Sequence, residues 1–224
     1  MSKIYKIRIR YFRANFLTQN AVAAAWREIV TNSGLAYAKA EKINPLFPRL
    51  TFGPPLALGM DSECEFADLY FENLPSEAEV LQKLSLTKKD GIGITGAKRI
   101  PYVFPSVATL AEAAEFWVFG LEKFNPPPLA DFLKKDVSVD IIHENGMKEE
   151  LDAKPFIVRA ADENGVFKIM LRSVNGRNLR AELFLAVWLR NPALFENGAF
   201  VKQGVKIIKK NLYYRNSLGE YEAV

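Results

Sequence analysis

Residues 3–11 read KIYKIRIRY, and this stretch defines the first element of the fold. Apolar and cationic residues alternate along it, with Tyr5, Ile7, Ile9 and Tyr11 at the apolar positions and Lys6, Arg8 and Arg10 at the cationic ones. Successive side chains of a β-strand point to opposite faces of the sheet, so strict alternation predicts a strand. The sequence therefore begins with a half-buried strand whose second face presents a ladder of cations.

The remainder of the first hundred residues predicts an α+β unit around this strand. Residues 21–30 have the apolar spacing of one helix face, and Gly34 ends that helix. Ser76 can cap a second helix, with Glu79 three residues later as in a capping box. The expected elements after the first strand are a helix at 21–30, strands at 50–56 and 64–71, a helix at 77–84 and a strand at 92–100. Their order is βαββαβ.

The same order of elements follows Pro105, although the two halves share no sequence repeat. The expected elements are a strand at 113–121, a short helix ending near Leu133, strands at 137–143, 149–159 and 166–174, a helix at 179–190 and a strand at 205–214. Asn164-Gly165 is typical of the turn in a hairpin. We therefore predict an α+β protein of tandem ferredoxin-like (βαββαβ) sandwiches with antiparallel sheets, in domains 1–104 and 105–224.

Residues 43–59, INPLFPRLTFGPPLALG, form a proline-rich segment between the first helix and the second strand. Its four prolines prevent a helix, because proline lacks a backbone donor and biases the preceding residue toward extended conformations. The segment is also too apolar for a solvated linker. We expect a rigid loop that holds its single cation, Arg49, beside the cationic ladder of the first strand.

Length and composition limit the class of protein. The chain has 224 residues, enough for one large domain or two small ones. It has neither a basic start followed by an apolar run nor a stretch of 18 apolar residues, so we expect no signal peptide and no membrane span. One cysteine, Cys64, excludes an intramolecular disulfide, which suits a reducing compartment. The expected location is the cytoplasm.

Charge is distributed unevenly along the chain. Residues 1–60 contain nine lysines and arginines against two acidic residues, a balance of +7. Residues 61–124 contain six against eleven, a balance of −5. This asymmetry indicates a cationic face near the N-terminus, compatible with a nucleic acid or another polyanion. The competing interpretation is a basic surface that is merely solvated.

The sequence offers few residues for metal or cofactor chemistry. One cysteine and one histidine, His143, cannot form a cysteine-ligated iron–sulfur cluster, a structural zinc site or a two-histidine metal site. We expect His143 in an exposed turn, and residues 91–96, GIGITG, as a bend between strands rather than a phosphate loop. The acids between Asp61 and Asp68 suggest a solvated strand face. We therefore expect no metal and no cofactor, and assign no catalytic residue.

Cations interleaved with aromatic residues form the candidate binding surface. Ferredoxin-like sheets often leave one face uncovered, where cations can hold phosphates and aromatic rings can stack on bases. The residues expected to bind RNA or a partner are Lys6, Arg8, Arg10, Asn44, Phe47, Arg49, Lys206, Lys209 and Lys210. The competing interpretation is that helices or a partner cover these faces and the cations only confer solubility.

Five segments resemble the radical-SAM-linked protein family of unknown function: IRIRYFR (7–13), KINPLFPRLTFGPPLALGMDSECEFADLYFE (42–72), IPYVFPSVATLAEAAEFWV (100–118), LDAKPFIVRA (151–160) and IKKNLYY (208–214). The most specific pattern within them is matched by Asn44, Pro45, Pro48, Arg49, Thr51, Phe52, Leu56, Leu58, Gly59, Ser62, Glu65 and Asp68. The resemblance implies a radical SAM protein as partner, because members are typically encoded beside or fused to a cobalamin-binding one. Residues 16–21, FLTQNA, depart from the family's usual Phe-Leu-Ser-His-Leu-Asp, so chemistry that needs that histidine and acid would be absent.

Three functions follow from these observations. The first is a cytoplasmic, non-enzymatic accessory protein that binds RNA or presents a substrate to a radical SAM partner. The second is an RNA-processing or RNA-modifying enzyme without metal, with a base such as Tyr11 or Glu65. The third is a structural module that docks to another protein through its proline-rich segment, residues 43–59.

Overall fold

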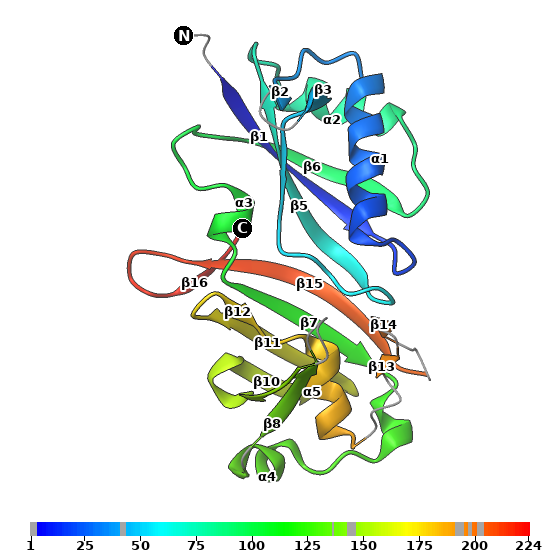
Figure 1. Cartoon of the computed structure of the whole chain (residues 1–224), viewed down its shortest axis with the longest axis vertical. Helices are drawn as coiled ribbons and strands as arrows, with labels where there is room; N and C mark the ends of the chain where they lie inside the picture. The colour runs from blue at the N-terminus through cyan, green and yellow to red at the C-terminus, as the bar shows by residue number, and fades with distance from the viewer. Residues whose placement is uncertain are drawn as a thin grey trace. The chain divides into compact units, whose positions relative to one another are not determined.

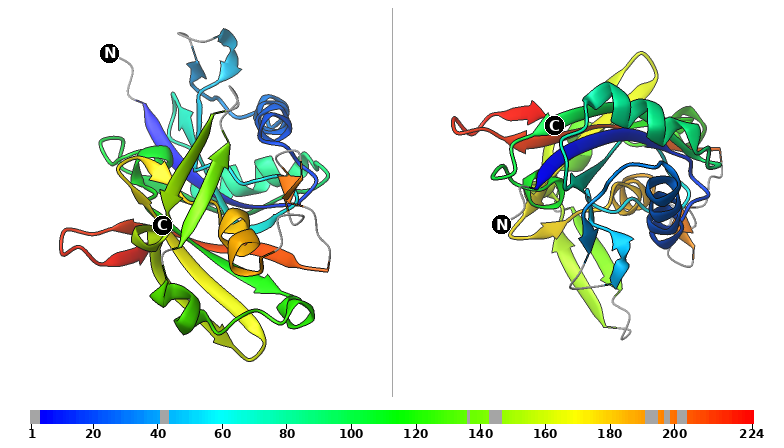
Figure 2. Two further views of the ribbon diagram at one scale, coloured as in Figure 1. Left: turned by 60° about the horizontal axis from the view of Figure 1, so that its bottom comes forward. Right: turned by 90° about the horizontal axis from the view of Figure 1, so that it is seen from above.

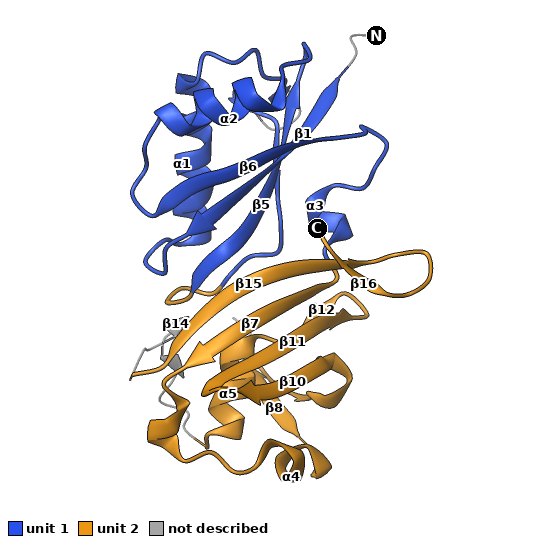
Figure 3. Ribbon diagram, turned by 180° about the vertical axis from the view of Figure 1, so that it is seen from behind, with its two compact units in different colours: residues 1–56, 61–111 blue, residues 57–60, 112–224 orange. Residues whose placement is uncertain are grey.

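The computed structural model describes residues 4–40, 44–135, 137–142, 147–190, 195–196, 199–200 and 204–224. The chain divides into two compact units, residues 1–56 with 61–111 (unit 1) and residues 57–60 with 112–224 (unit 2), coloured separately in Figure 3. The expected division after residue 104 falls within the last part of unit 1. No helix among the described residues is long and apolar enough to cross a membrane.

Unit 1 combines an antiparallel sheet with helices (Figure 1). Its elements are β1 (Tyr5–Arg13), α1 (Gln19–Asn32), β2 (Lys39–Ala40), β3 (Asn44–Pro48), β4 (Leu50–Phe52), β5 (Asp61–Phe71), α2 (Glu77–Leu86), β6 (Ile92–Ile100) and α3 (Val107–Leu110). The main sheet has the order β4-β5-β1-β6, and every neighbouring pair is antiparallel. The proline-rich segment forms β3, which pairs with β2, and then β4. Strand β4 ends at Phe52, shortly before Pro54 and Pro55, which cannot donate to a strand neighbour.

Both long helices of unit 1 begin at capped residues and bury one face. The Thr18 hydroxyl accepts a hydrogen bond from the amide of Ala21 at 3.1 Å, and Ser76 does the same for Glu79 at 3.1 Å. The buried positions are Val22, Trp26, Ile29 and Val30 on α1, and Val80 and Leu84 on α2. They share one hydrophobic core with Ile7, Ile9 and Tyr11 of β1. Figure 2 shows α1 to one side of β1. The predicted strand and its apolar face are therefore confirmed.

Unit 2 also has long strands that are antiparallel to their neighbours. Its elements are β7 (Ala113–Phe119), η1 (Leu121–Phe124), α4 (Leu129–Lys134), β8 (Ser138–Ile142), β9 (Lys148–Asp152), η2 (Lys154–Phe156), β10 (Ile157–Glu163), β11 (Val166–Val174), β12 (Arg177–Asn178), α5 (Ala181–Trp188), β13 (Phe195–Glu196), β14 (Ala199–Phe200), β15 (Lys206–Arg215) and β16 (Tyr221–Ala223). The main sheet has the order β10-β11-β7-β15. Helix α5 packs on it through aromatic contacts, with ring centroids of Phe167 and Trp188 4.5 Å apart.

The prediction of an α+β fold is confirmed. The main strands are β4-β5-β1-β6 in unit 1 and β10-β11-β7-β15 in unit 2. Numbered along the chain within each unit, both read second, third, first, fourth. This is the order of a βαββαβ sandwich, so it supports the ferredoxin-like prediction without establishing it. The expected strand at 149–159 is wrong, because Pro155 lies in the short helix η2 that separates β9 from β10. Strand β9 pairs with β8 instead, in a separate two-stranded sheet.

Candidate nucleic-acid interface

The candidate interface is the face of β1 that points away from the hydrophobic core of unit 1, here named the cationic face. Lys6, Arg8, Arg10 and Phe12 alternate with the core residues and therefore stand on this face. Their direct neighbours on β5 are Tyr70, Asp68 and Phe66, and those on β6 include Lys98, Gly96 and Gly93. The strand thus brings cations, aromatic rings and glycines together on one surface.

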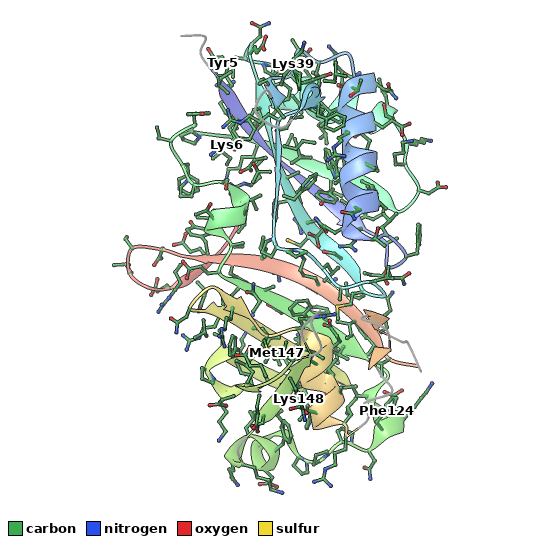
Figure 4. The ribbon with its side chains drawn as sticks, in the orientation of Figure 1. Tyr5, Lys6, Lys39, Phe124, Met147 and Lys148 are labelled. Atoms are coloured by element: carbon green, nitrogen blue, oxygen red, sulfur yellow. The ribbon has the colours of Figure 1, made fainter. Side chains whose placement is uncertain are left out.

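Two of the predicted binding cations, Lys6 and Arg8, are buried. Residues 101–107, which run from the end of β6 to the first residue of α3, cover them. The Lys6 ammonium donates to the carbonyl of Tyr102 at 3.4 Å and to that of Phe104, and Figure 4 shows this side chain beside the covering segment. Arg8 Nη2 donates to the carbonyl of Pro105 at 3.1 Å. The expectation of a solvent-exposed ladder is therefore corrected for these two residues, because their donors bond to backbone carbonyls of the covering segment.

Asp68 neutralises Arg8 at the centre of the cationic face. Its two carboxylate oxygens accept hydrogen bonds from Arg8 Nε at 2.7 Å and Nη2 at 3.1 Å, and the amide of Val107 donates to the same group at 2.8 Å. Both charged side chains are buried. The expectation of a solvated acidic strand face is thus wrong for Asp68, which is the partner of a buried arginine. The pair joins β1 and β5 to the start of α3.

Burial also lowers the pKa of Lys6. Removal from water is the largest effect and lowers its pKa below the ordinary lysine value, and the nearby Arg8 and Arg49 charges act in the same direction. Asp68 opposes this shift. Lys6 therefore serves the covering segment as a hydrogen-bond donor, and is not displayed to solvent.

The other end of the cationic face is exposed. Arg10 is exposed, and the side chains of Phe12 and Phe16 are 43% and 61% exposed. A Cβ atom on Gly93 would lie 1.7 Å from Cε1 of Phe12, and one on Gly91 would lie 2.8 Å from Cζ of Phe16. Each ring therefore lies directly against a glycine of β6 or its preceding turn. The GIGITG segment is not simply a bend: most of it is strand β6, whose missing side chains leave room for the rings of β1 and the turn after it.

Arg49 lies at the edge of the covered region of the cationic face, against Tyr102 of the covering segment. Its guanidinium carbon is 4.2 Å from the ring centroid of Tyr70 and 5.9 Å from that of Tyr102, and Nη2 donates to the Tyr102 hydroxyl at 3.4 Å. These contacts fix the position of an exposed cation. Phe47 contacts the guanidinium of Arg27 at 4.5 Å and does not contact Arg49 in any described interaction, and the side chain of Asn44 lies outside the described residues.

The three C-terminal lysines of the predicted surface have different environments in unit 2. Lys206 is exposed, Lys209 is buried, and Lys210 is half-buried, with its ammonium 4.7 Å from the ring centroid of Trp117. Lys168, the direct neighbour of Trp117 on β11, approaches the same ring at 4.6 Å. Trp117 is thus flanked by cations from the strands on both sides of β7.

A buried carboxylate anchors this second surface. Glu115 accepts hydrogen bonds from Trp117 Nε1 at 2.8 Å, Arg159 Nη2 at 2.6 Å and the Tyr213 hydroxyl at 2.6 Å. Burial alone would raise the pKa of Glu115, but these donors outweigh it and lower the pKa below its ordinary value. Burial and the bond to Glu115 raise the pKa of Tyr213 to about 12. The network fixes the indole edge of Trp117.

The residues considered as a catalytic base are not accessible. Tyr11 and Glu65 are cross-strand neighbours, and both are buried. Tyr11 packs against Trp26 with ring centroids 5.0 Å apart, and burial raises its pKa above the ordinary tyrosine value. Cys64 is buried, and His143 lies outside the described residues. The described part of the chain contains no group of three or more His, Cys, Asp or Glu that could hold a metal ion.

Sequence reasoning identified Arg10 and Arg49 as exposed cations with aromatic residues near them, Phe12 and Phe16 included, but missed Trp117. The alternation of β1 extends to Phe12, which places its ring on the same face as Arg10. The glycines at 91, 93 and 96 were the signal that large side chains lie across β6. No feature of the sequence indicated that cations flank Trp117, because Lys168 and Lys210 are distant from it in sequence.

The Arg8–Asp68 pair should contribute strongly to the stability of unit 1. We expect Asp68→Ala to lower the free energy of unfolding by about 3–5 kcal/mol, since Arg8 would remain buried without its counter-charge. Chemical denaturation at pH 7 measures this loss. Glu63→Ala, which removes an exposed carboxylate from the same strand, is the matched control and should change stability by less than about 0.5 kcal/mol. Equal losses in both variants would contradict a special role for Asp68.

The Glu115 network should make stability depend on pH in the acid range. The folded-state pKa of Glu115 lies below its unfolded value of about 4.3, so its contribution is present above that pH and is lost as pH falls through the folded pKa. We expect Glu115→Gln to cost about 1.5–3 kcal/mol at pH 7 and clearly less at pH 3. Tyr213→Phe, which removes one of the three donors, should cost less at pH 7. A cost of Glu115→Gln that is independent of pH would contradict this interpretation.

No curated protein matches this chain. The model of one protein family, described as "Uncharacterized protein conserved in bacteria (DUF2344)", matches residues 6–181, which is most of the chain. The protein therefore belongs to this uncharacterised family of conserved bacterial proteins.

Proposed function

We propose that this protein binds single-stranded RNA through the exposed end of the cationic face of unit 1. The observation that supports the proposal is the position of Phe12 and Phe16, two exposed rings seated on glycines beside the exposed Arg10. Exposed aromatic rings that lie close together mark an interaction site more often than single exposed apolar residues do. Unpaired bases are the RNA groups that stack on such rings.

The glycines support a stacking role for the rings. Gly93 lies so close to Phe12 that any side chain at position 93 would displace the ring. The ring thus has one side against the sheet and an exposed surface, as a stacking platform requires. A platform held in place before binding loses little conformational freedom when a base stacks on it.

The exposed cations supply the contacts to the phosphates. Arg10 and Lys98 stand on the cationic face of β1 and β6, and Arg49 is held over Tyr70 on the same face. Residues 1–60 have a net charge of +7, which attracts a polyanion. Phosphate contacts position the strand, and stacking adds affinity without requiring a particular base.

Unit 2 has a similar combination of groups on its own sheet. Trp117 is half-buried between the ammonium groups of Lys168 and Lys210, and Lys206 is exposed. The Lys168 ammonium is already paired with the Glu163 carboxylate, so this surface adds no phosphate contact to the proposal, and the Trp117 ring alone is a second candidate for base stacking.

The proposed protein is an accessory factor that acts in the cytoplasm. The single buried cysteine suits a reducing compartment. A radical SAM partner rests on the sequence resemblance alone, and RNA or another substrate presented to that partner would occupy the surface described above. The enzymatic alternative is less well supported, because Tyr11 and Glu65 are buried and a general base must reach its substrate.

The proposal is tested by binding of a fluorescent 12-nucleotide oligouridine at several salt concentrations. We expect affinity to fall steeply with salt, and Arg10→Ala to reduce the slope of log K against log salt by about 0.7. Phe12→Leu keeps an apolar side chain but removes the ring, so it should weaken binding about 5- to 150-fold with the slope unchanged. Binding to duplex RNA should be weaker.

Lys83→Ala is the charge-matched control for Arg10→Ala. Lys83 lies on α2, which packs on the core side of the sheet, and should leave both affinity and salt slope unchanged. Affinity that is absent, insensitive to salt, or equally reduced by Lys83→Ala and Arg10→Ala would refute the proposed surface.

A further inference from the structure

Residues 101–105, PYVFP, form an exposed apolar segment between β6 and α3, here named the apolar loop. It is the green excursion that follows β6 in Figure 1. Val103 is 92% exposed and Tyr102 is 50% exposed, and the three other residues of the loop are exposed as well. Five consecutive residues without a charge are thus presented to solvent. Contiguous apolar surface of this kind marks an interaction site more often than an isolated exposed leucine does.

Buried cations hold the loop in one conformation. Lys6 donates to the carbonyls of Tyr102 and Phe104, and Arg8 donates to that of Pro105. The amide of Phe104 donates to the carbonyl of Pro101 at 3.0 Å and closes a tight turn. Every contact restrains the backbone of the loop, and none of them covers the Val103 side chain.

Proline adds to this restraint at both ends of the loop. Pro101 and Pro105 each have a fixed φ angle, which reduces the freedom of the chain before binding. Tyr102 contacts Tyr70 edge to face, with centroids 6.3 Å apart, and its hydroxyl accepts from Arg49. A loop that is ordered in advance loses less entropy when it binds a partner.

We propose that the apolar loop docks into an apolar pocket on a partner protein and that carboxylates rim this pocket. Val103 and Phe104 would fill the pocket. The rim is inferred from charge complementarity, because the exposed Lys98 stands on the face of β6 that the loop covers, and Arg49 lies beside Tyr102. Two cations beside an apolar tip favour an acidic rim on the partner.

A shaped protein pocket fits the loop better than RNA or a lipid surface. The most exposed residue, Val103, has neither a ring for stacking nor a donor for a phosphate. Insertion into lipid does not require a fixed backbone, whereas the carbonyls of Tyr102, Phe104 and Pro105 are all fixed by buried cations. Specific docking does benefit from such order.

The test begins with the full chain carrying the photoreactive residue p-benzoylphenylalanine in place of Val103. Cells of the native bacterium are irradiated, and the cross-linked protein is identified, purified and titrated with the unmodified chain. We expect Val103→Ser to weaken this complex about tenfold or more, and Lys98→Ala to reduce its dependence on salt. The cross-linked peptide of the partner should contain apolar residues next to Asp or Glu.

Leu218→Ser is the matched control, because Leu218 is also an exposed aliphatic residue, 81% exposed, in the turn between β15 and β16. It should leave the complex unchanged, and Val103→Ser should leave oligouridine affinity unchanged. The proposal is overturned if the photoreactive chain cross-links to no protein, or only to a second copy of itself or to RNA. It is also overturned if the purified complex tolerates Val103→Ser, or if this variant instead abolishes binding to vesicles of anionic phospholipid.

Discussion

The buried pair of Arg8 and Asp68 is the interaction on which the arrangement of unit 1 depends. Strand β1 has two buried sides over part of its length: Ile7 and Ile9 pack in the hydrophobic core, and Lys6 and Arg8 lie beneath residues 101–107. Asp68 makes burial of the second side of β1 possible, because it supplies the counter-charge for Arg8 and accepts a hydrogen bond from the amide of Val107. A buried arginine without a counter-charge would be strongly destabilising. One carboxylate therefore fixes the path of the chain between β6 and α3.

This constraint divides the cationic face into regions with different roles. Under the covering segment, Lys6 and Arg8 act as hydrogen-bond donors to backbone carbonyls. Beyond it, Arg10 remains exposed beside Phe12, whereas Arg49 is held by Tyr70 and by Tyr102 of the covering segment. The same residue type thus serves as structure in the middle of the strand and as accessible charge at its end. The proposals of RNA binding and protein docking share Lys98 and Arg49, while Phe12 serves the first alone and Val103 the second alone.

The sequence predicted the elements of unit 1 better than it predicted the environment of its polar side chains. The alternation of β1 and the caps at Thr18 and Ser76 depend on residues close in sequence, so the strand and the starts of both helices could be inferred from them. Burial of Arg8 depends on Asp68, sixty residues later, and on a loop nearly a hundred residues later. Neither periodicity nor composition reports which strand lies next to β1 or in what register. The exposure of the Phe12 side chain could not be inferred for the same reason, since it depends on Gly93 of β6.

The choice of cations rather than apolar residues beneath the loop has a physical reason. The carbonyls of Tyr102, Phe104 and Pro105 point toward the sheet and have no strand neighbour, so each needs a donor. Apolar side chains at positions 6 and 8 would pack in the same space but leave these acceptors unsatisfied. A lysine or arginine supplies several donors from one position and reaches beyond its own strand. Alternating cations on a strand can therefore indicate a scaffold for a loop as well as a binding surface. In β1 the scaffold cations are Lys6 and Arg8, which donate to carbonyls of the segment above them, whereas Arg10 lies between Phe66 and Gly96 and stays exposed.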